Sequence, residues 1–141
     1  MLKGIPKLLS PELIKILAEM GHGDEIVIGD ANFPAVQYGR RVVRADGIGG
    51  AELLSAILSV MPLDTYAAEN FILMEVVKGD AVPVIWEDYR RVAAEKEPNA
   101  RIGYMERFAF YERAKEAFAV IASGEKQINT KKKKKKGARD L

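Results

Sequence analysis

Short runs of consecutive apolar residues alternate along this chain with longer segments of helical periodicity. The runs predict strands at 26–29, 42–44, 71–77, 102–105 and 118–122, and the periodic segments predict helices at 11–20, 51–61, 83–97 and 109–117. Strands that are apolar on both faces are typical of parallel sheets, and helices between strands supply the crossovers that such sheets need. The sequence therefore predicts an α/β fold, a single domain with a mainly parallel sheet flanked by helices.

Two positions at the ends of predicted strands are candidates for binding. In parallel sheets of α/β proteins, ligands bind beyond the carboxyl ends of the strands. Asp30 follows the first predicted strand directly, and residues 105–108 mark the end of the fourth. Ligand contacts are therefore expected near both positions.

The residue types present exclude several kinds of chemistry. The chain contains no cysteine and one histidine. A structural zinc site, which needs several such ligands, is not expected, and catalysis by a Cys–His pair is excluded. The first residues lack the uninterrupted apolar core of a signal peptide, and no apolar run approaches the ~18–20 residues that cross a bilayer. The expectation is a cytoplasmic protein that inserts into no membrane.

The formal net charge of +2 hides an acidic body. Six of the 22 basic residues form one run, Lys131–Lys136, and without that run 16 basic residues stand against 20 acidic ones. A body with this balance is not the basic surface typical of nucleic-acid binding, so no nucleic-acid partner is expected. The run itself is interpreted as a solvated end, with a polyanion-binding or nuclear-import tail as the alternative.

The one histidine, His22, stands between two glycines ahead of the first predicted strand, and acids follow it at once. Flanking glycines let another molecule approach closely. Nearby carboxylates can orient an imidazole and suit it to proton transfer near neutral pH. His22 is therefore a candidate acid/base group, and a surface or helix-capping histidine is the alternative.

Asp30 and Arg107 are candidates for holding a polar ligand. Asp30 is interpreted either as a loop cap or as an acceptor for ligand hydroxyls, which bind strongly to a carboxylate. Arg107 stands ahead of the predicted helix 109–117, and its guanidinium is a fixed fork of donors. Phe108 or Tyr111 is a candidate for packing on an apolar ligand face, with core packing as the alternative for at least one of them.

The rest of that helix is predicted to be amphipathic. Three of its residues are expected to face the core (Phe110, Ala114 and Ala117), and two are expected to face solvent (Glu112 and Arg113). No metal or nucleotide is predicted, because the acids near His22 have no recognised ligand spacing and Gly47–Gly50 matches no phosphate-loop pattern.

Several ordered stretches resemble the fucose mutarotase and ribose pyranase family, in particular its L-fucose branch. They are GIPKLLSPELIKILAEMGHGDEIVIGDANFPA, RADGIGGAELLSAIL, PLDTY and ERFAFYERAKEAFAVIASGE. The resemblance extends over about residues 2–125. Ribose pyranases carry GHTD where this chain has GHGD, and they lack the RFAFYERA segment, so the fucose branch is the better match.

The resemblance implies a ribose pyranase-like fold and an isomerase that interconverts the α and β anomers of a free sugar. Such enzymes need no metal or organic cofactor, and their subunits form rings, typically decamers of two stacked pentamers, with the sites near subunit boundaries. The matching motifs imply that His22 is the acid/base group and that Asp30 and Arg107 bind the monosaccharide substrate.

The C-terminal end departs from the family pattern. Where the family has Tyr-Gly-Asn and an apolar strand, this chain has Asn129-Thr130-Lys131 and further lysines. Residues 1–125 are therefore expected to form a mutarotase-like domain and residues 126–141 an atypical lysine-rich tail. An L-fucose mutarotase is expected, and a D-ribose pyranase-type mutarotase or a non-catalytic sugar-binding relative are the alternatives.

Overall fold

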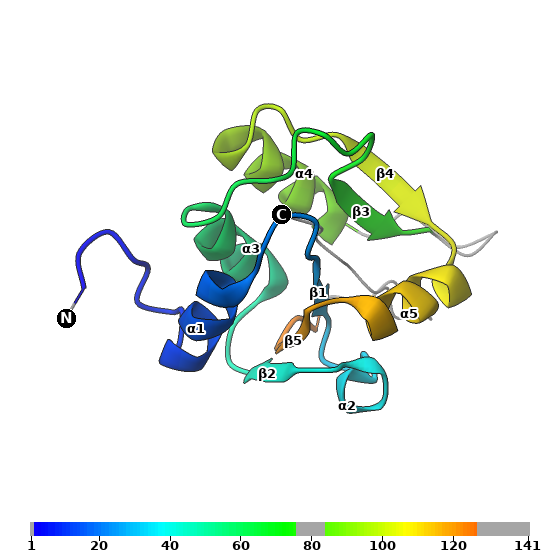
Figure 1. The fold of residues 1–141 in the computed structure, drawn as a ribbon, viewed down its shortest axis with the longest axis horizontal. Helices are drawn as coiled ribbons and strands as arrows, with labels where there is room; N and C mark the ends of the chain where they lie inside the picture. The colour runs from blue at the N-terminus through cyan, green and yellow to red at the C-terminus, as the bar shows by residue number, and fades with distance from the viewer. Residues whose placement is uncertain (1, 76–83, 127–141) are drawn as a thin grey trace.

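The computed structural model of the chain describes residues 2–75 and 84–126. Their elements alternate between helix and strand along the sequence, as predicted (Figure 1). In order they are α1 (Pro11–Glu19), β1 (Ile26–Gly29), α2 (Ala35–Tyr38), β2 (Val42–Ala45), α3 (Gly50–Leu58), β3 (Phe71–Met74), α4 (Ile85–Lys96), β4 (Ile102–Met105), α5 (Arg107–Glu116) and β5 (Ala119–Ser123). The predictions for residues 76–83 lie outside the described residues. The same is true of the predicted C-terminal tail, of which only Lys126 is described.

The strands form two parallel sheets (Figure 1). One has the order β1-β5-β2, with Ile26 and Val42 pairing with Ala119 and Val120 of β5. The other joins β3 to β4, in a register that pairs Phe71 with Ile102. The α/β class and the parallel pairing are thus confirmed, although two sheets replace the one expected. β5, the last strand of the described residues, is central in the larger sheet.

Apolar layers cover both faces of the sheets. On one face, side chains of β1, β2, β3 and β5 pack with α1, α3 and α4 in one buried cluster. On the other face, alternate residues of β1, β3 and β5 pack with α2 and α5 in a second cluster. Strands buried on both sides explain the continuous apolar runs in the sequence, because neither face meets water. Within the described residues, no helix is long and apolar enough to cross a membrane.

Two helix starts show how side chains fix the element boundaries. The Ser10 hydroxyl accepts a hydrogen bond from the Leu13 amide at 3.1 Å, which caps α1 at the start predicted for this helix. The Glu106 carboxylate caps α5 in the same way, accepting from the amides of Phe108 and Ala109 at 2.8 and 3.2 Å. Because of this cap, α5 begins two residues earlier than predicted, and Arg107 is its first residue.

One residue of α5 differs from its predicted role. Phe110, Ala114 and Ala117 are buried, as predicted. Arg113 is not simply solvated: its guanidinium forms an ion pair with the Glu25 carboxylate, with Nη2–Oε1 at 2.6 Å and Nε–Oε2 at 3.0 Å. Glu25 stands just ahead of β1, so this pair fastens α5 to the start of that strand. The helical pattern alone does not reveal a carboxylate 88 residues away.

Candidate functional site

Asp30 lies at the carboxyl end of β1 and is buried, with 3% of its surface exposed. One carboxylate oxygen, Oδ1, accepts a hydrogen bond from the Asn32 amide at 2.9 Å, and the Asp30 carbonyl accepts from the Phe33 amide at 3.1 Å. These bonds shape the tight turn that follows the strand. Asp30 therefore does cap its loop, and its carboxylate is held in a fixed place at the sheet edge.

The end of β5 supports the same edge. The Ser123 hydroxyl donates to the Gly29 carbonyl at 2.6 Å, and the amide of Ala31 donates to the Glu125 carbonyl at 3.0 Å. The Glu125 carboxylate in turn accepts from the Gly50 amide at 2.9 Å, at the first residue of α3. Carboxylates favour the positive end of a helix, so Glu125 stabilises the approach of α3 to the sheet.

Tyr89 of α4 is buried beside this edge. Its hydroxyl lies against the Cα of Gly50, in the space that a larger residue at position 50 would fill. Burial raises the pKa of the Tyr89 hydroxyl, and the negative charges of Glu125 and Asp30 raise it further. Tyr89 is therefore a neutral phenol near two carboxylates.

Arg107 is the first residue of α5, directly after the short connection from β4. Its side chain is exposed, and the guanidinium lies 4.7 Å from the centre of the Phe108 ring. Burial raises the pKa of the Tyr111 hydroxyl, Arg107 opposes that rise, and Asp30 adds to it. Both Arg107 and Asp30 thus act electrostatically on Tyr111, which places the two sugar-binding candidates around one aromatic side chain.

His22 lies at the other end of β1. Its turn is closed by the Asp24 carboxylate, which accepts from the Gly21 amide at 2.7 Å, and Gly23 adopts a φ of +88°. Left-handed backbone of this kind favours glycine, so the turn needs Gly23 for its shape. The imidazole is exposed. It meets the edge of the Tyr66 ring, with ring centres 5.7 Å apart.

The carboxylates that follow His22 have partners in the structure. Asp24 bonds to the turn, and Glu25 is engaged by Arg113. The ring contact with Tyr66 was not predicted, because Tyr66 lies 44 positions further along the chain, in the loop ahead of β3. Tyr66 ends the stretch PLDTY, which is one of the stretches that carry the family resemblance. Nothing in that stretch distinguished Tyr66 as a site residue.

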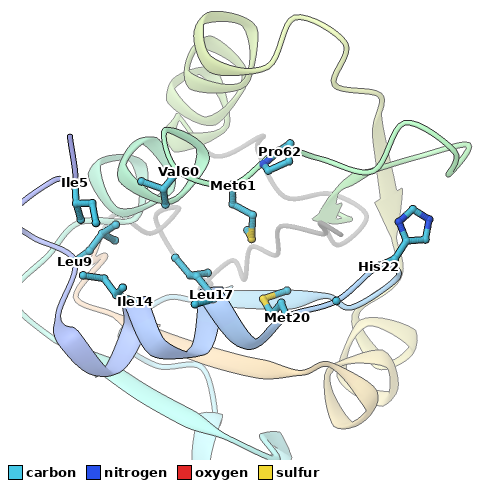
Figure 2. A pocket seen from close by; sticks show the side chains of 11 residues that line it. Ile5, Leu9, Ile14, Leu17, Met20, His22, Val60, Met61 and Pro62 are labelled. Carbon is cyan, nitrogen blue, oxygen red and sulfur yellow. The ribbon is translucent and has the colours of Figure 1, made fainter. Parts of the chain in front are cut away.

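An apolar groove of about 410 Å³ leads to His22 (Figure 2). Side chains of α1 and of the segment after α3 form its walls, and Figure 2 shows His22 beyond Met20 at one end. The lining residues are Ile5, Leu9, Ile14, Leu17, Ala18, Met20, Gly21, His22, Val60, Met61 and Pro62. Apart from the imidazole, the groove offers few groups to bind sugar hydroxyls.

The structure therefore brings together two of the three candidates and separates the third. Asp30 and Arg107 lie at the carboxyl ends of β1 and β4, whereas His22 precedes β1. A strand of four residues alone spans about 13 Å. In the part of the chain that the structure describes, no three His, Asp or Glu side chains gather as metal ligands.

Comparison with known proteins identifies the family. The model of the RbsD / FucU transport protein family matches residues 3–130. The chain belongs to the RbsD / FucU family. A fucose mutarotase of Mus musculus is 48% identical over 99% of this chain and 96% of its own length.

Solved structures extend this result. The fucose mutarotase of Streptococcus pneumoniae, crystallised with L-fucose, matches this member of the RbsD / FucU family with a TM-score of 0.88 and 42% identity over 99% of both chains. RbsD of Bacillus subtilis, crystallised with D-ribose, has a TM-score of 0.70 over 100% of this chain and 98% of its own, at 23% identity. That second likeness shows the shared fold alone.

Proposed function

We propose that this protein is an L-fucose mutarotase, a cofactor-independent isomerase that interconverts the α and β anomers of the free sugar. One observation carries the proposal: over nearly the full length of both chains, the structure matches a fucose mutarotase that was crystallised with L-fucose. The identity with the mouse fucose mutarotase agrees with it. The proposed catalytic domain is residues 1–125, with 126–141 as a tail.

The proposed reaction opens and closes the sugar ring. The anomeric hydroxyl gives its proton to a base on the opposite side, a second group or a water molecule, while the ring oxygen gains one. The bond between C1 and the ring oxygen breaks to leave an aldehyde. Rotation about the C1–C2 bond presents the other face of the aldehyde, and closure reverses both proton transfers. His22 donates to the ring oxygen and withdraws that proton on closure. Positioned proton transfer of this kind is worth about 10²–10⁴-fold in rate.

Asp30 and Arg107 hold the sugar in this proposal. The Asp30 carboxylate accepts hydrogen bonds from hydroxyls, and its fixed place in the turn after β1 means that little freedom is lost on binding. Arg107 donates from a guanidinium that projects from the first residue of α5. Both bonds involve a charged group and are stronger than neutral ones.

The separation of His22 from Asp30 supports a site shared by two copies of the chain. The strand between them is longer than a pyranose ring is wide, and His22 is exposed on its own turn. We propose that His22 of one copy reaches the Asp30 and Arg107 edge of the next. Such a head-to-tail contact forms a ring when the rotation between neighbouring copies closes. A ring of this kind is compatible with the decamer that the family resemblance implies.

The proposed location of the protein is the cytoplasm. The chain has no cysteine, so its fold depends on no disulfide and suits a reducing compartment. Its substrate there is a free monosaccharide.

Saturation-transfer NMR on the anomeric protons of L-fucose at equilibrium tests the activity. We expect exchange between the anomers with wild-type protein, and little above the spontaneous rate with His22→Ala. Arg91→Ala is the control, because it removes an exposed arginine of α4 that pairs with Asp88 and takes no part in the proposed mechanism. Sugar binding without exchange by a correctly assembled wild-type protein would contradict the proposal and favour a non-catalytic relative. Faster exchange of D-ribose than of L-fucose would favour a ribose pyranase.

A further inference from the structure

Four aromatic side chains contact one another in a connected group between the two sugar-binding candidates. We call Phe33, Tyr38, Phe108 and Tyr111 the aromatic ridge. Tyr111 is at its centre: its ring stacks on Tyr38 at 5.1 Å between centres and meets Phe33 and Phe108 edge-on at 5.6 and 6.3 Å. The ridge joins the turn after β1 to the first turn of α5.

The ridge begins beside Asp30 and ends beside Arg107. Phe33 is three residues after Asp30, and its amide donates to the Asp30 carbonyl. The Phe33 side chain folds back over Gly29, where an added Cβ would lie 2.5 Å from the Phe33 Cβ. At the other end, Arg107 covers part of Phe108. An apolar strip therefore lies between a carboxylate and a guanidinium.

Exposure increases along the strip. Phe33 is 6% exposed and belongs to the core, Tyr111 is half-buried, and Phe108 is 61% exposed. The outer part of the ridge thus presents aromatic surface to water, where it gains nothing from packing within the chain. Burial of that surface against an apolar group is favourable.

L-fucose has a matching arrangement of groups. Its hydroxyls need charged or polar partners, whereas C5 carries a methyl group in place of the hydroxymethyl group of an ordinary hexose. A sugar held through its hydroxyls by Asp30 and Arg107 has the strip between those two side chains within reach of the rest of its ring. The methyl group is the part of this sugar that an aromatic surface stabilises most.

We propose that the aromatic ridge binds the C5 methyl group of L-fucose, and that Phe108 is a specificity-determining residue. This inference rests on the proposed function and adds the basis of its substrate preference. Phe108 touches the substrate but takes part in no proton transfer, so it acts on sugar choice more than on ring opening.

D-arabinose is the probe that isolates the methyl group, because its pyranose form has the ring stereochemistry of L-fucose without C6. Anomer exchange is measured with both sugars, and the ratio of kcat/KM for L-fucose over D-arabinose is compared between variants. One methyl group in an apolar site changes such a ratio by about tenfold or more. We expect wild-type protein to prefer L-fucose, and Phe108→Ala to lose about that factor while keeping its activity on D-arabinose.

Arg91→Ala is the control, since it changes an exposed side chain of α4 outside the ridge; the preference for L-fucose should persist. Phe108 is exposed, so Phe108→Ala should fold, and circular dichroism with size-exclusion chromatography checks folding and assembly. An unchanged ratio, or an equal loss with both sugars accompanied by dissociation of the assembly, would overturn the ridge proposal. Failure of the wild-type protein to exchange L-fucose at all would instead overturn the proposed function.

Discussion

His22 and Asp30 lie at opposite ends of β1, one ahead of Ile26 and the other directly after Gly29. They are eight positions apart in the sequence, yet the extended strand keeps their side chains from meeting on one small ligand. The strand is buried along its whole length and cannot bend to bring them together. This separation is the basis of the proposal that two copies of the chain share one site.

Mixed assemblies test this shared site. His22→Ala and Arg107→Ala should each be inactive in anomer exchange. When the two variants are co-expressed and assemble at random, about a quarter of the boundaries combine an intact His22 with an intact Arg107. We expect exchange to return to about that fraction of the wild-type rate. No recovery from assemblies shown by mass spectrometry to be mixed would mean that each site lies within one chain.

The contact between Tyr89 and Gly50 predicts a large effect of a small substitution. In Gly50→Ala the new methyl group would meet the Tyr89 hydroxyl, so the helix or the tyrosine must shift. Overpacking of this kind lowers the free energy of unfolding by about 1–3 kcal/mol. Urea denaturation at fixed protein concentration measures the loss. Tyr89→Phe removes the clashing oxygen and should recover part of it in the double variant, whereas equal losses in both backgrounds would contradict this account.

The ion pair between Arg113 and Glu25 should contribute measurably to stability. The Glu25 side chain is only 16% exposed, so Arg113→Ala leaves a largely buried carboxylate without its guanidinium. We expect unfolding to become easier by about 1–3 kcal/mol, the usual cost of removing a partner from a buried charged group. Arg91→Ala is the matched comparison: it breaks an exposed pair with Asp88 and should change stability by less than about 1 kcal/mol. Similar losses in the two variants would argue against a special role for the Glu25 pair.

Alkaline pH should destabilise the fold through Tyr89. Burial raises the pKa of its hydroxyl above the value of 10.0 for an exposed tyrosine. Above that pH the unfolded chain loses this proton while the folded chain keeps it. The contribution to stability is therefore complete below pH 10 and falls as the pH rises toward the higher folded value.

Urea denaturation at about pH 8 and about pH 11, on either side of the tyrosine pKa, measures that loss. Tyr89→Phe should lose less stability between the two pH values than wild-type protein. The same substitution at the exposed Tyr66 should leave the pH dependence unchanged. If Tyr89→Phe lost as much stability between the two pH values as wild-type protein, other groups would be the cause of the alkaline destabilisation.

Local patterns determined much of this protein. The apolar runs predicted strands that the structure places at 26–29 and 102–105 with the same bounds. The first of them is buried along its whole length, and a strand buried on both faces must be apolar throughout. Ser10 and Pro11 marked the start of α1 for reasons that act within one helical turn. The resemblance of the ordered motifs indicated the family that the comparisons then showed.

Tertiary structure alone decided how these parts meet. The central place of β5, the division into two sheets and the pairing of Arg113 with Glu25 depend on contacts between residues far apart in sequence, which no local pattern contains. The same holds for the aromatic ridge, which joins Phe33 to Tyr111 and so links Asp30 to Arg107. His22 and Asp30 are only eight positions apart in the sequence, but the extended strand between them moves the chain forward by about 3.3 Å with every residue and sets them apart.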